Sequence, residues 1–415
     1  MSSRSSFCIK SKPLSLFFVA TVLAASACAE DTPEISVKRV PDQGLQPQTV
    51  MGPDGAVHVI YFKGEPASGN IFYCRLDRAN GHEWASPIRV NSQEGSAVAM
   101  GTIRGANIAI GKSNRVHIAW NGSSQSEPKG IPNPAMPKDS PYRFSAPMLY
   151  SRLNSDRKSF EEQRNLMTHT YALDGGGSIA ADQEDRVHVA WHANSVRDSG
   201  SGEKDRAVWV ATSLDSGDSF ATELRGNQAD TGACGCCGLS TFCDSRGRLA
   251  IIYRTATDTV NRDLHLLWRG ANENEFESQL LSQWSAATCM MSKSTFCQSA
   301  DRTFAAWEWE NRVQYSMLKR DSVLGNDLLG RGRSWTSVGG TSPHKHPCLA
   351  VNKAGQMLLA WTEGTGWKRG GEISWQVFDR LGKPLRRVSG KAKGLPAWSF
   401  AAAYANGDGS FTILY

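Results

Sequence analysis

Seven copies of one short motif are spread along this chain, and they limit its fold more than its composition does. Each copy begins with a Gly, Asn or Asp turn, continues as a short apolar strand, and ends in an aromatic residue. The copies span residues 55–61, 114–120, 185–191, 247–253, 301–307, 355–361 and 409–415. The last three intervals between the terminal aromatic residues are each 54 residues long. A fixed period of this size in strand-rich sequence is typical of β-propeller blades.

Each copy is flanked by further strand patterns. Another short apolar strand precedes it, as at residues 106–110, 178–181 and 348–351. After six of the copies comes a further hairpin, over residues 71–90, 148–166, 208–224, 264–281, 313–329 and 373–388. If the strands of one unit are labelled A to D, the repeated motif is strand B. The pattern predicts an all-β propeller of four-stranded blades.

The count leaves six complete blades and a seventh A–B pair, whose edge would be unpaired. The apolar strand at residues 35–40 can cover that edge. We therefore predict seven blades, with the ring closed by pairing of the N- and C-terminal strands. The alternative is a ring of six blades, which would leave one repeat outside the circle.

Residues 1–29 have the pattern of an export signal. Arg4, Lys10 and Lys12 precede an apolar run at residues 14–25 that is too short to span a bilayer as a helix. Cleavage after Ala29 would release a secreted chain, which we favour, whereas a lipobox-like reading of residues 25–28 would leave Cys28 lipidated. We predict an exported protein, periplasmic or extracellular, with residues 30–415 forming the propeller.

The net charge and the hydropathy of the chain limit the kinds of partner that it is expected to bind. Loss of residues 1–29 removes three basic residues and no acidic one, so the formal net charge falls from +6 to +3. A charge this small gives no reason to expect nucleic acid as a ligand. No later stretch is apolar and long enough for a membrane helix.

The third C–D hairpin carries a turn motif, Ser-x-Asp-x-Gly-x-Ser-Phe. In it, Asp215 is placed to accept hydrogen bonds from turn amides, Gly217 to take a positive φ, and Phe220 to anchor the hairpin after Ser213. Weaker versions occur at residues 77–84 and 154–160. These residues are expected to be structural.

With these motifs and the repeat, residues 30–415 resemble the sialidase-like Asp-box (BNR repeat) propellers. The stretch at 234–263 also resembles a bacterial subgroup with a Cys-x-Cys-Cys element. The resemblance implies a propeller and, if the chain is an enzyme, a glycoside hydrolase. The Arg-Ile-Pro motif of true sialidases is absent, so catalytic residues are not assigned and the fold alone does not license that activity.

The D-to-A and B-to-C loops of a propeller share one face, opposite the Asp-box turns, and we expect a binding site there. Arginine is suited to bidentate binding of a carboxylate or sulfate, as on an acidic sugar. A surface ion pair between Arg262 and Asp263 is the alternative reading of two of these residues. The candidates for a carbohydrate or other anionic ligand are Arg104, Arg254, Arg262, Asp263, Glu308, Glu310 and Glu363.

Sulfur and imidazole groups gather in the D-to-A loops of three successive blades. In an exported chain we favour disulfides, for instance between Cys289 and one of the three cysteines of the first loop. A soft-metal site, suited to copper, is the alternative; no other cofactor is expected. The residues concerned are Cys234, Cys236, Cys237, Cys289, Met290, His344, His346 and Cys348.

The histidines His58, His117 and His188 hold the same strand position in three blades. This placement favours packing or hydrogen bonding within the blades over a metal site. The leading prediction is thus an exported, sialidase-like propeller that binds, and as an enzyme would hydrolyse, a carbohydrate or other anionic ligand. The alternative is a non-catalytic binding scaffold or a copper site at the cysteine loop.

Overall fold

A computed structural model provides the three-dimensional description of the chain. It describes residues 1, 32–77, 83–140, 143–198, 200, 202–259, 261–286, 288, 290–299, 302–318, 336–339 and 342–415. The chain divides into two units, Met1–Thr32 and Pro33–Tyr415, and every described strand belongs to the second. Among the described residues, no helix is long and apolar enough to cross a membrane.

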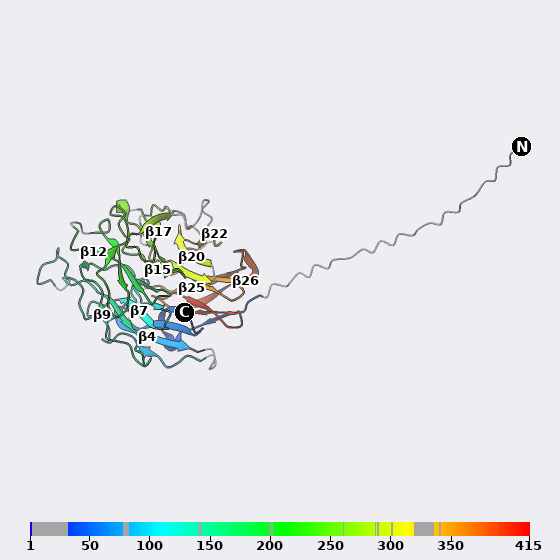
Figure 1. Cartoon of the computed structure of the whole chain (residues 1–415), viewed down its shortest axis with the longest axis horizontal. Helices are drawn as coiled ribbons and strands as arrows, with labels where there is room; N and C mark the ends of the chain where they lie inside the picture. Colours follow the sequence, from blue (N-terminus) through cyan, green and yellow to red (C-terminus); the bar gives the residue numbers. More distant parts are fainter. Residues whose placement is uncertain are drawn as a thin grey trace. The chain divides into compact units, whose positions relative to one another are not determined.

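Seven small sheets form a seven-bladed β-propeller, as the sequence predicts (Figure 1). The A strands are β2 (Leu45–Met51), β6 (Asn107–Ile110), β11 (Ser178–Ala181), β15 (Ser240–Cys243), β19 (Thr295–Ser299), β23 (His344–Val351) and β27 (Ala402–Ala405). The B strands are β3 (Val57–Glu65), β7 (Val116–Asn121), β12 (Val187–Ser195), β16 (Leu249–Arg254), β20 (Arg302–Trp309), β24 (Met357–Glu363) and β28 (Phe411–Leu414).

Six blades continue into C and D strands. The C strands are β4 (Ser68–Leu76), β8 (Met148–Arg152), β13 (Ala207–Ser213), β17 (Leu264–Arg269), β21 (Arg312–Leu318) and β25 (Gly371–Phe378). The D strands are β5 (Ile88–Arg89), β9 (Arg164–Asn165), β14 (Leu224–Arg225), β18 (Glu277–Ser282), β22 (Thr336–Ser337) and β26 (Pro384–Leu395). A further short strand, β10 (Thr170–Tyr171), pairs with the extended end of β12.

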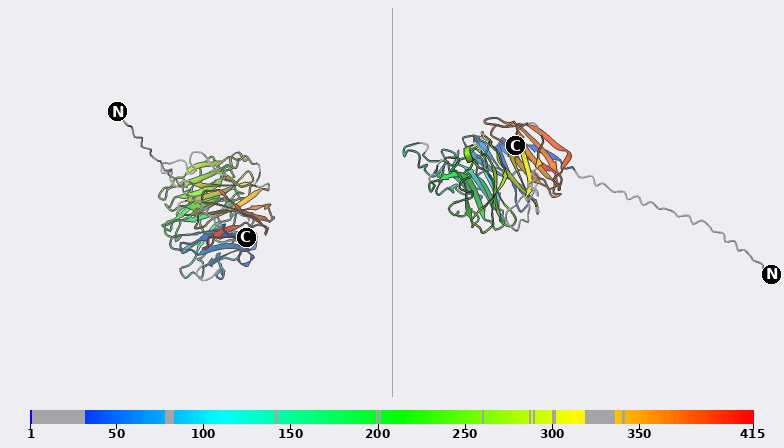
Figure 2. Two further views of the ribbon diagram at one scale, coloured as in Figure 1. Left: turned by 90° about the vertical axis from the view of Figure 1, so that its right-hand side faces the viewer. Right: turned by 90° about the horizontal axis from the view of Figure 1, so that it is seen from above.

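The ring is closed by β1 (Ile35–Lys38), which pairs with β28 in the last blade. The pairing is parallel, from Ile35 beside Phe411 to Lys38 beside Leu414. In an antiparallel blade the D strand runs parallel to the B strand, so β1 has the direction of a D strand but lies directly beside B. Its end leads through a short 3₁₀ turn, η1 (Pro41–Gln43), into the first blade, and the red C-terminal strands lie beside the blue first blade in Figures 1 and 2. The predicted closure is confirmed.

The core lies between neighbouring blades, with one apolar cluster at each of the seven blade interfaces. The aromatic residue that ends each copy of the repeated motif packs against the preceding blade: Trp120 joins Ile60 and Tyr73 of the first blade, and Trp191 joins Met148 of the second. Burial of these large side chains is the main favourable term in folding. The repeat therefore encodes the contact between blades.

The repeated histidines bond within their own blades. His58 and His117 each place Nδ1 2.7 Å from a tyrosine hydroxyl on the adjacent C strand, and His188 bonds Thr212 at 3.0 Å. Burial lowers the pKa of His117 and of His188 to about 3, so both rings are neutral at pH 7. Their predicted structural role is confirmed.

The turn after β13 has the hydrogen bonds expected of its sequence. Asp215 accepts from the amide and hydroxyl of Ser219 at 2.9 and 2.6 Å and from the hydroxyl of Ser213 at 2.7 Å. Gly217 has φ +80°, and Phe220 packs edge-on against Tyr150 of the neighbouring blade. The turn ties two blades together at the face opposite the D-to-A loops.

Candidate functional site

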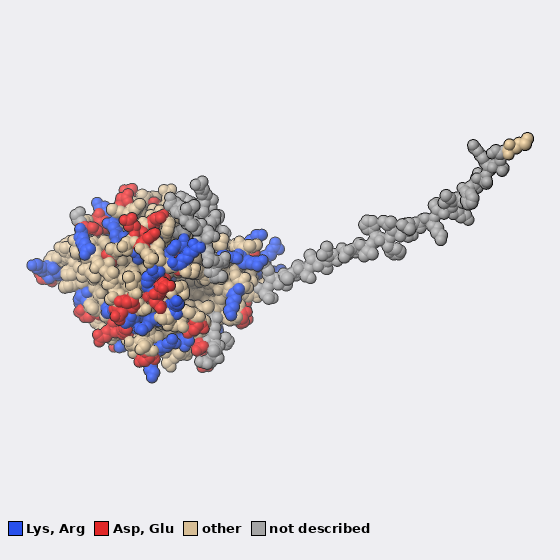
Figure 3. All heavy atoms as spheres, in the orientation of Figure 1, with Lys and Arg blue, Asp and Glu red and all other residues tan. Residues whose placement is uncertain are grey.

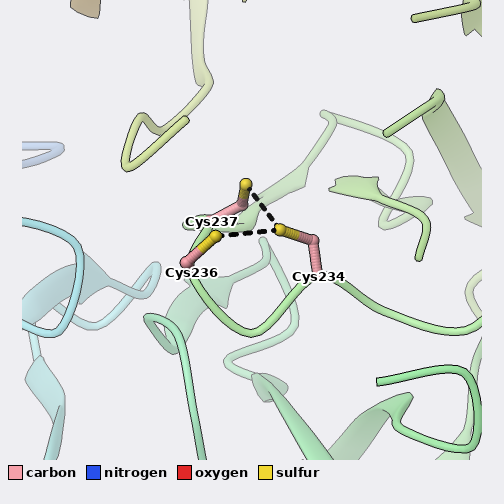
Figure 4. A group of neighbouring side chains, drawn as sticks. All are labelled: Cys234, Cys236 and Cys237. Atoms are coloured by element: carbon pink, nitrogen blue, oxygen red, sulfur yellow. Dashed lines mark hydrogen bonds between the residues drawn. The ribbon is translucent and has the colours of Figure 1, made fainter. Parts of the chain in front are cut away.

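Three cysteine sulfurs meet in the D-to-A loop that precedes β15 (Figure 4). The Sγ of Cys234 lies 3.4 Å from that of Cys236 and 2.9 Å from that of Cys237. All three sulfurs lie within 4.8 Å of one another. Two sulfurs bound to one zinc-sized ion at about 2.3 Å can be up to about 4.6 Å apart. The loop thus presents three thiols to one point in space.

The sulfurs lie in a small enclosed cluster of their own. Cys234 and Cys237 are fully buried, and they pack with Ala286 and Met290 from the next blade, with Trp284 at the side. The loop backbone is fixed at both ends: the amide of Cys234 donates to the carbonyl of Arg254 at 3.0 Å, and that of Gly238 to Ser292 at 3.0 Å. The thiols are therefore held by two adjacent blades.

Two arginines predicted as ligand-binding residues lie beside this cluster and are buried. Arg254, at the end of β16, is 3% exposed; it donates to the carbonyl oxygens of Arg262 and Glu308 and lies over the ring of Trp284. Arg262 is 6% exposed and bonds Glu203 at 2.9 Å. Asp263 instead accepts from the amide of Trp284 at 2.8 Å. No ion pair links Arg262 to Asp263 among the described contacts.

A line of alternating charges runs from the second blade to this loop. Arg104 bonds Asp174 at 2.6 Å, and Arg206 lies 3.7 Å from Asp174 and 3.8 Å from Glu203, which in turn bonds Arg262. These residues belong to loops of three blades on the D-to-A face. The line therefore ties the cysteine loop to the second and third blades.

Gly235 is where this charged line holds the cysteine loop. Its amide donates to Glu203 at 3.3 Å. A Cβ at this position would lie 2.6 Å from an oxygen of Asp174 and would also meet the guanidinium of Arg206. A larger residue here would therefore have to displace the charged ends of Asp174 and Arg206.

The thiols differ in acidity. Hydrogen bonds with Cys236 and Cys237, together with the charge of Arg262, lower the pKa of Cys234. Burial raises the pKa of Cys237, against a lowering by Arg254. The thiolate is the form that binds metals and acts as a nucleophile. Of these two thiols, only Cys234 is therefore shifted toward the thiolate, chiefly by its sulfur neighbours and with a smaller contribution from Arg262.

Several polar atoms around the loop lack a partner in the described structure. His192 is fully buried and neither ring nitrogen is hydrogen-bonded. Arg206 has no partner for Nε, nor has Arg262. Glu308 is 1% exposed, neither carboxylate oxygen makes a hydrogen bond of normal geometry, and burial raises its pKa against the lowering by Arg254, Lys345 and the side chain of Ser292. Unpaired buried polar groups are costly and are found at binding and catalytic sites.

The remaining predicted residues lie in other places. Glu363 bonds Lys391 at 2.6 Å and Trp361 at 3.1 Å, with His344 3.8 Å away. Glu310 is exposed in the turn after β20.

His346 and Cys348 lie on the sixth blade, near the axis of the ring. The ring of His346 lies 5.7 Å from the ring of Phe400, and the amine of Lys293 lies over that same ring. Electrostatic attraction to Cys348 favours the charged form of Lys293. Lys293 lines an axial cavity of about 480 Å³ formed by the A strands of all seven blades. Burial lowers the pKa of Lys293 to about 7. Of the predicted sulfur and imidazole groups, only Met290 packs with the three cysteines in the described structure.

The predicted disulfides are not formed among the described cysteines. Cys74, Cys234, Cys236, Cys237, Cys243, Cys297 and Cys348 are all free. Cys28 and Cys289 lie outside the described residues, as does the predicted export signal after Met1.

Four residues near the loop were not predicted from the sequence: Asp174, His192, Glu203 and Arg206. His192 directly follows the repeated aromatic residue Trp191, and Arg254 and Glu308 occupy the same position in the next two blades. The position directly after the repeated aromatic residue is therefore the sequence signal that could have identified His192. Asp174, Glu203 and Arg206 lie in loops of unequal length, so they do not recur at a fixed position of the repeat.

Charges of both signs are interspersed over the face drawn in Figure 3, without a large area of one sign.

No protein family matches the sequence, and no curated protein matches it. Among solved structures, an α-L-arabinanase of Penicillium chrysogenum bound to arabinobiose is 12% identical, with a TM-score of 0.49 over 83% of this chain and 95% of its own. A Hadza microbial sialidase is 10% identical, with a TM-score of 0.49 over 82% of this chain and 69% of its own. An ulvan lyase is 13% identical, with a TM-score of 0.46 over 84% and 81%. At such low identity the function has to be argued from this chain's own residues.

Proposed function

We propose that this propeller binds a thiophilic metal ion through Cys234, Cys236 and Cys237. The observation that carries the proposal is the convergence of three thiols from one four-residue loop, of which Cys234 and Cys237 are buried and Cys236 is partly exposed, flanked by two buried arginines. Three thiolates held this close repel one another unless a cation lies between them. Cys and Met are the ligands that soft ions prefer.

Other cysteines of the chain provide the contrast. Cys348 is also buried, but it packs among apolar residues and burial raises its pKa to about 12. Such a cysteine behaves as a small apolar residue. The loop differs because three thiols meet there beside two buried guanidinium groups, and because the pKa of Cys234 is lowered, which favours the thiolate that a metal requires.

The test is metal binding by the full chain under reducing, anaerobic conditions. We expect one Ag(I) or Cu(I) ion per chain, measured by elemental analysis after desalting, with a matching loss of titratable thiols. Replacing Cys234 and Cys237 with serine should abolish binding. Cys243→Ser, in the A strand that follows the loop, is the matched control and should leave the stoichiometry at one.

Absence of any bound ion in the reduced protein, or equal binding by the double variant, would overturn the proposal. Recovery of the three loop cysteines as disulfides from the native compartment would also overturn it.

We further propose that the site belongs to an exported, divergent Asp-box propeller whose D-to-A face binds carbohydrate. The supporting observation is Trp367, in the B-to-C loop of the sixth blade, which is 50% exposed and packs edge-on against Trp398. Its ring reaches Gly101 in the second blade, where a Cβ would lie 3.7 Å away, beside Arg104. An exposed aromatic face next to an arginine suits an acidic sugar.

We propose binding without hydrolysis on this face. Arg206 bridges Asp174 and Glu203, but the backbone of Gly235 occupies the space between these carboxylates. A glycosidase needs room there for substrate and water. Titration of uronate and sialate oligosaccharides, followed by tryptophan fluorescence, tests this: Trp367→Ala should abolish the response, and an unchanged response would contradict it.

A further inference from the structure

We propose that the axial cavity of the propeller is a separate binding site for the anion of a small organic acid, and that the amine of Lys293 binds the charged group. The A strands of all seven blades line this cavity, which has a volume of about 480 Å³. Pockets for small organic ligands have volumes of about 300–1,000 Å³. The space therefore suits a ligand that has an organic body as well as a charged group.

One positive charge stands in this cavity. Lys293 is the only Lys, Arg, Asp or Glu among the described residues that line it; the others carry hydroxyl, amide, thiol, thioether, aromatic or aliphatic groups. Its amine lies 3.7 Å from the centre of the Phe400 ring. Lys293 and Phe400 each lie two residues before the A strand of their blade, so this pair is at the D-to-A end of the cavity.

The amine of Lys293 has no anionic partner in the described part of the chain. It lies over the face of Phe400, and the other group that acts on it is Cys348. Burial raises the pKa of Cys348 to about 12, so this thiol is uncharged at pH 7. An aromatic ring attracts a cation but does not neutralise it. The positive charge is therefore left for a bound molecule to compensate.

Hydroxyl groups that line the cavity can complete the site. Ser294 is 5% exposed, and its hydroxyl has no partner in the described structure. The hydroxyl oxygens of Ser178 and Thr241, on neighbouring blades, are 2.9 Å apart. Only one of these two groups can donate in the bond between them, which leaves the proton of the other for a ligand. Hydrogen bonds to an ionised acceptor are stronger than those between neutral groups.

The energetics of the amine favour an anion over other ligands. Burial lowers the pKa of Lys293 to about 7, because the charged form has lost part of its hydration. A carboxylate beside the amine compensates for this loss, whereas a cation is repelled and a neutral molecule leaves the ammonium unpaired.

The cavity is distinct from the sites proposed above. The described lining residues include neither Trp367 nor any of the three loop cysteines. Binding in the cavity therefore does not depend on the metal or on a carbohydrate at the D-to-A face.

The experiment titrates the full chain with acetate, benzoate and gluconate near neutral pH and low salt, followed by isothermal titration calorimetry. Each carboxylate is compared with an uncharged analogue: acetamide, benzamide or sorbitol. We expect at least one carboxylate to bind with one ligand per chain, and its analogue not to bind at the same concentration. Inorganic sulfate, which has charge but no organic body, should bind more weakly than that carboxylate.

Variants test the role of the amine. Lys293→Met removes the charge and keeps a side chain of similar length, so it should weaken binding by roughly tenfold to a hundredfold. Lys293→Arg keeps the charge and should bind more tightly than Lys293→Met. Lys391→Met is the matched control, because the amine of Lys391 bonds Glu363 at 2.6 Å outside the cavity, and its affinity should equal that of the unchanged chain.

A measurement on the unchanged chain locates the ligand without any variant. Reductive methylation with formaldehyde and cyanoborohydride modifies accessible lysine amines, and mass spectrometry of the peptides reports each lysine. The bound carboxylate should slow the modification of Lys293 several-fold and leave that of Lys391 unchanged.

Several results would overturn the proposal. These are no carboxylate binding better than its neutral analogue, equal affinity in Lys293→Met, or modification of Lys293 at the same rate with and without the ligand. Sulfate binding as tightly as the best carboxylate would overturn the assignment of an organic ligand. The protection measurement decides the matter if Lys293→Met does not fold.

Discussion

The blades and the surroundings of the cysteine loop differ in how far their buried polar groups are paired. Within the blades, His58, His117 and His188 recur at one position, and each bonds a hydroxyl on the neighbouring strand through Nδ1, although its Nε2 has no described partner. Beside the loop, neither ring nitrogen of His192 and neither carboxylate oxygen of Glu308 makes a hydrogen bond of normal geometry. Each repeated histidine is thus paired at one atom, whereas the surroundings of the loop leave whole polar groups unpaired.

The largest effect that should separate the two regions is loss of a repeated aromatic. Trp120→Ala empties a fully packed position between the first two blades and should lower the free energy of unfolding by roughly 3–5 kcal/mol. Urea unfolding measures this. Metal stoichiometry of the folded variant should stay at one; its loss would show that blade packing and site are not separable.

Next in size is stabilisation by the ion itself. At a free Cu(I) concentration about 100 times its dissociation constant, the folded chain should gain about 2.7 kcal/mol. Thermal unfolding with Cu(I) and with excess chelator measures the difference. Cys234→Ser with Cys237→Ser should show none, and an equal gain in that variant would place the ion elsewhere.

A third test uses the pH dependence of the scaffold. Because burial lowers the pKa of His117 to about 3, the unfolded chain, with a histidine pKa of about 6.5, takes up a proton that the folded chain does not. Stability therefore falls as the pH drops below 6.5, by about 2 kcal/mol for this residue at pH 5.

His117→Gln should remove that part of the slope between pH 7 and pH 5 in urea unfolding. Tyr150→Phe keeps the imidazole but loses its hydrogen bond, so it should lower stability equally at both pH values. An unchanged slope in His117→Gln would contradict the assigned burial.

The smallest expected effect lies at the face opposite the loop. Asp215→Ala removes the acceptor of the turn amide and hydroxyl of Ser219 and should cost about 1 kcal/mol. Metal affinity should not change. A change in affinity would connect this turn to the site and weaken the contrast between the two regions.

The repeat made the fold predictable. Each copy carries both the strand pattern and the aromatic residue that packs on the preceding blade, so local sequence and long-range contact have the same period. The closing strand was also predictable, because an unpaired edge has to be covered. Its parallel pairing was not, since it depends on which strands of the last blade are present.

The site was predictable only in part. The cysteines and both buried arginines stood out because they break the repeat. Their neighbours did not, since Asp174, Glu203 and Arg206 come from loops of unequal length that meet only when three blades are side by side.

By itself, the sequence determined a closed ring of blades, the sided layout of its loops and a cluster of sulfur on one face. Only the tertiary structure decided that Arg254 and Arg262 lie against the cysteines and are not open to an anion, and that His344 and His346 have other neighbours. The physical reason is that each repeat contains the apolar residues that it buries, so burial can be predicted from local sequence. The charges around a thiol instead come from loops of separate blades, which meet only in the closed ring.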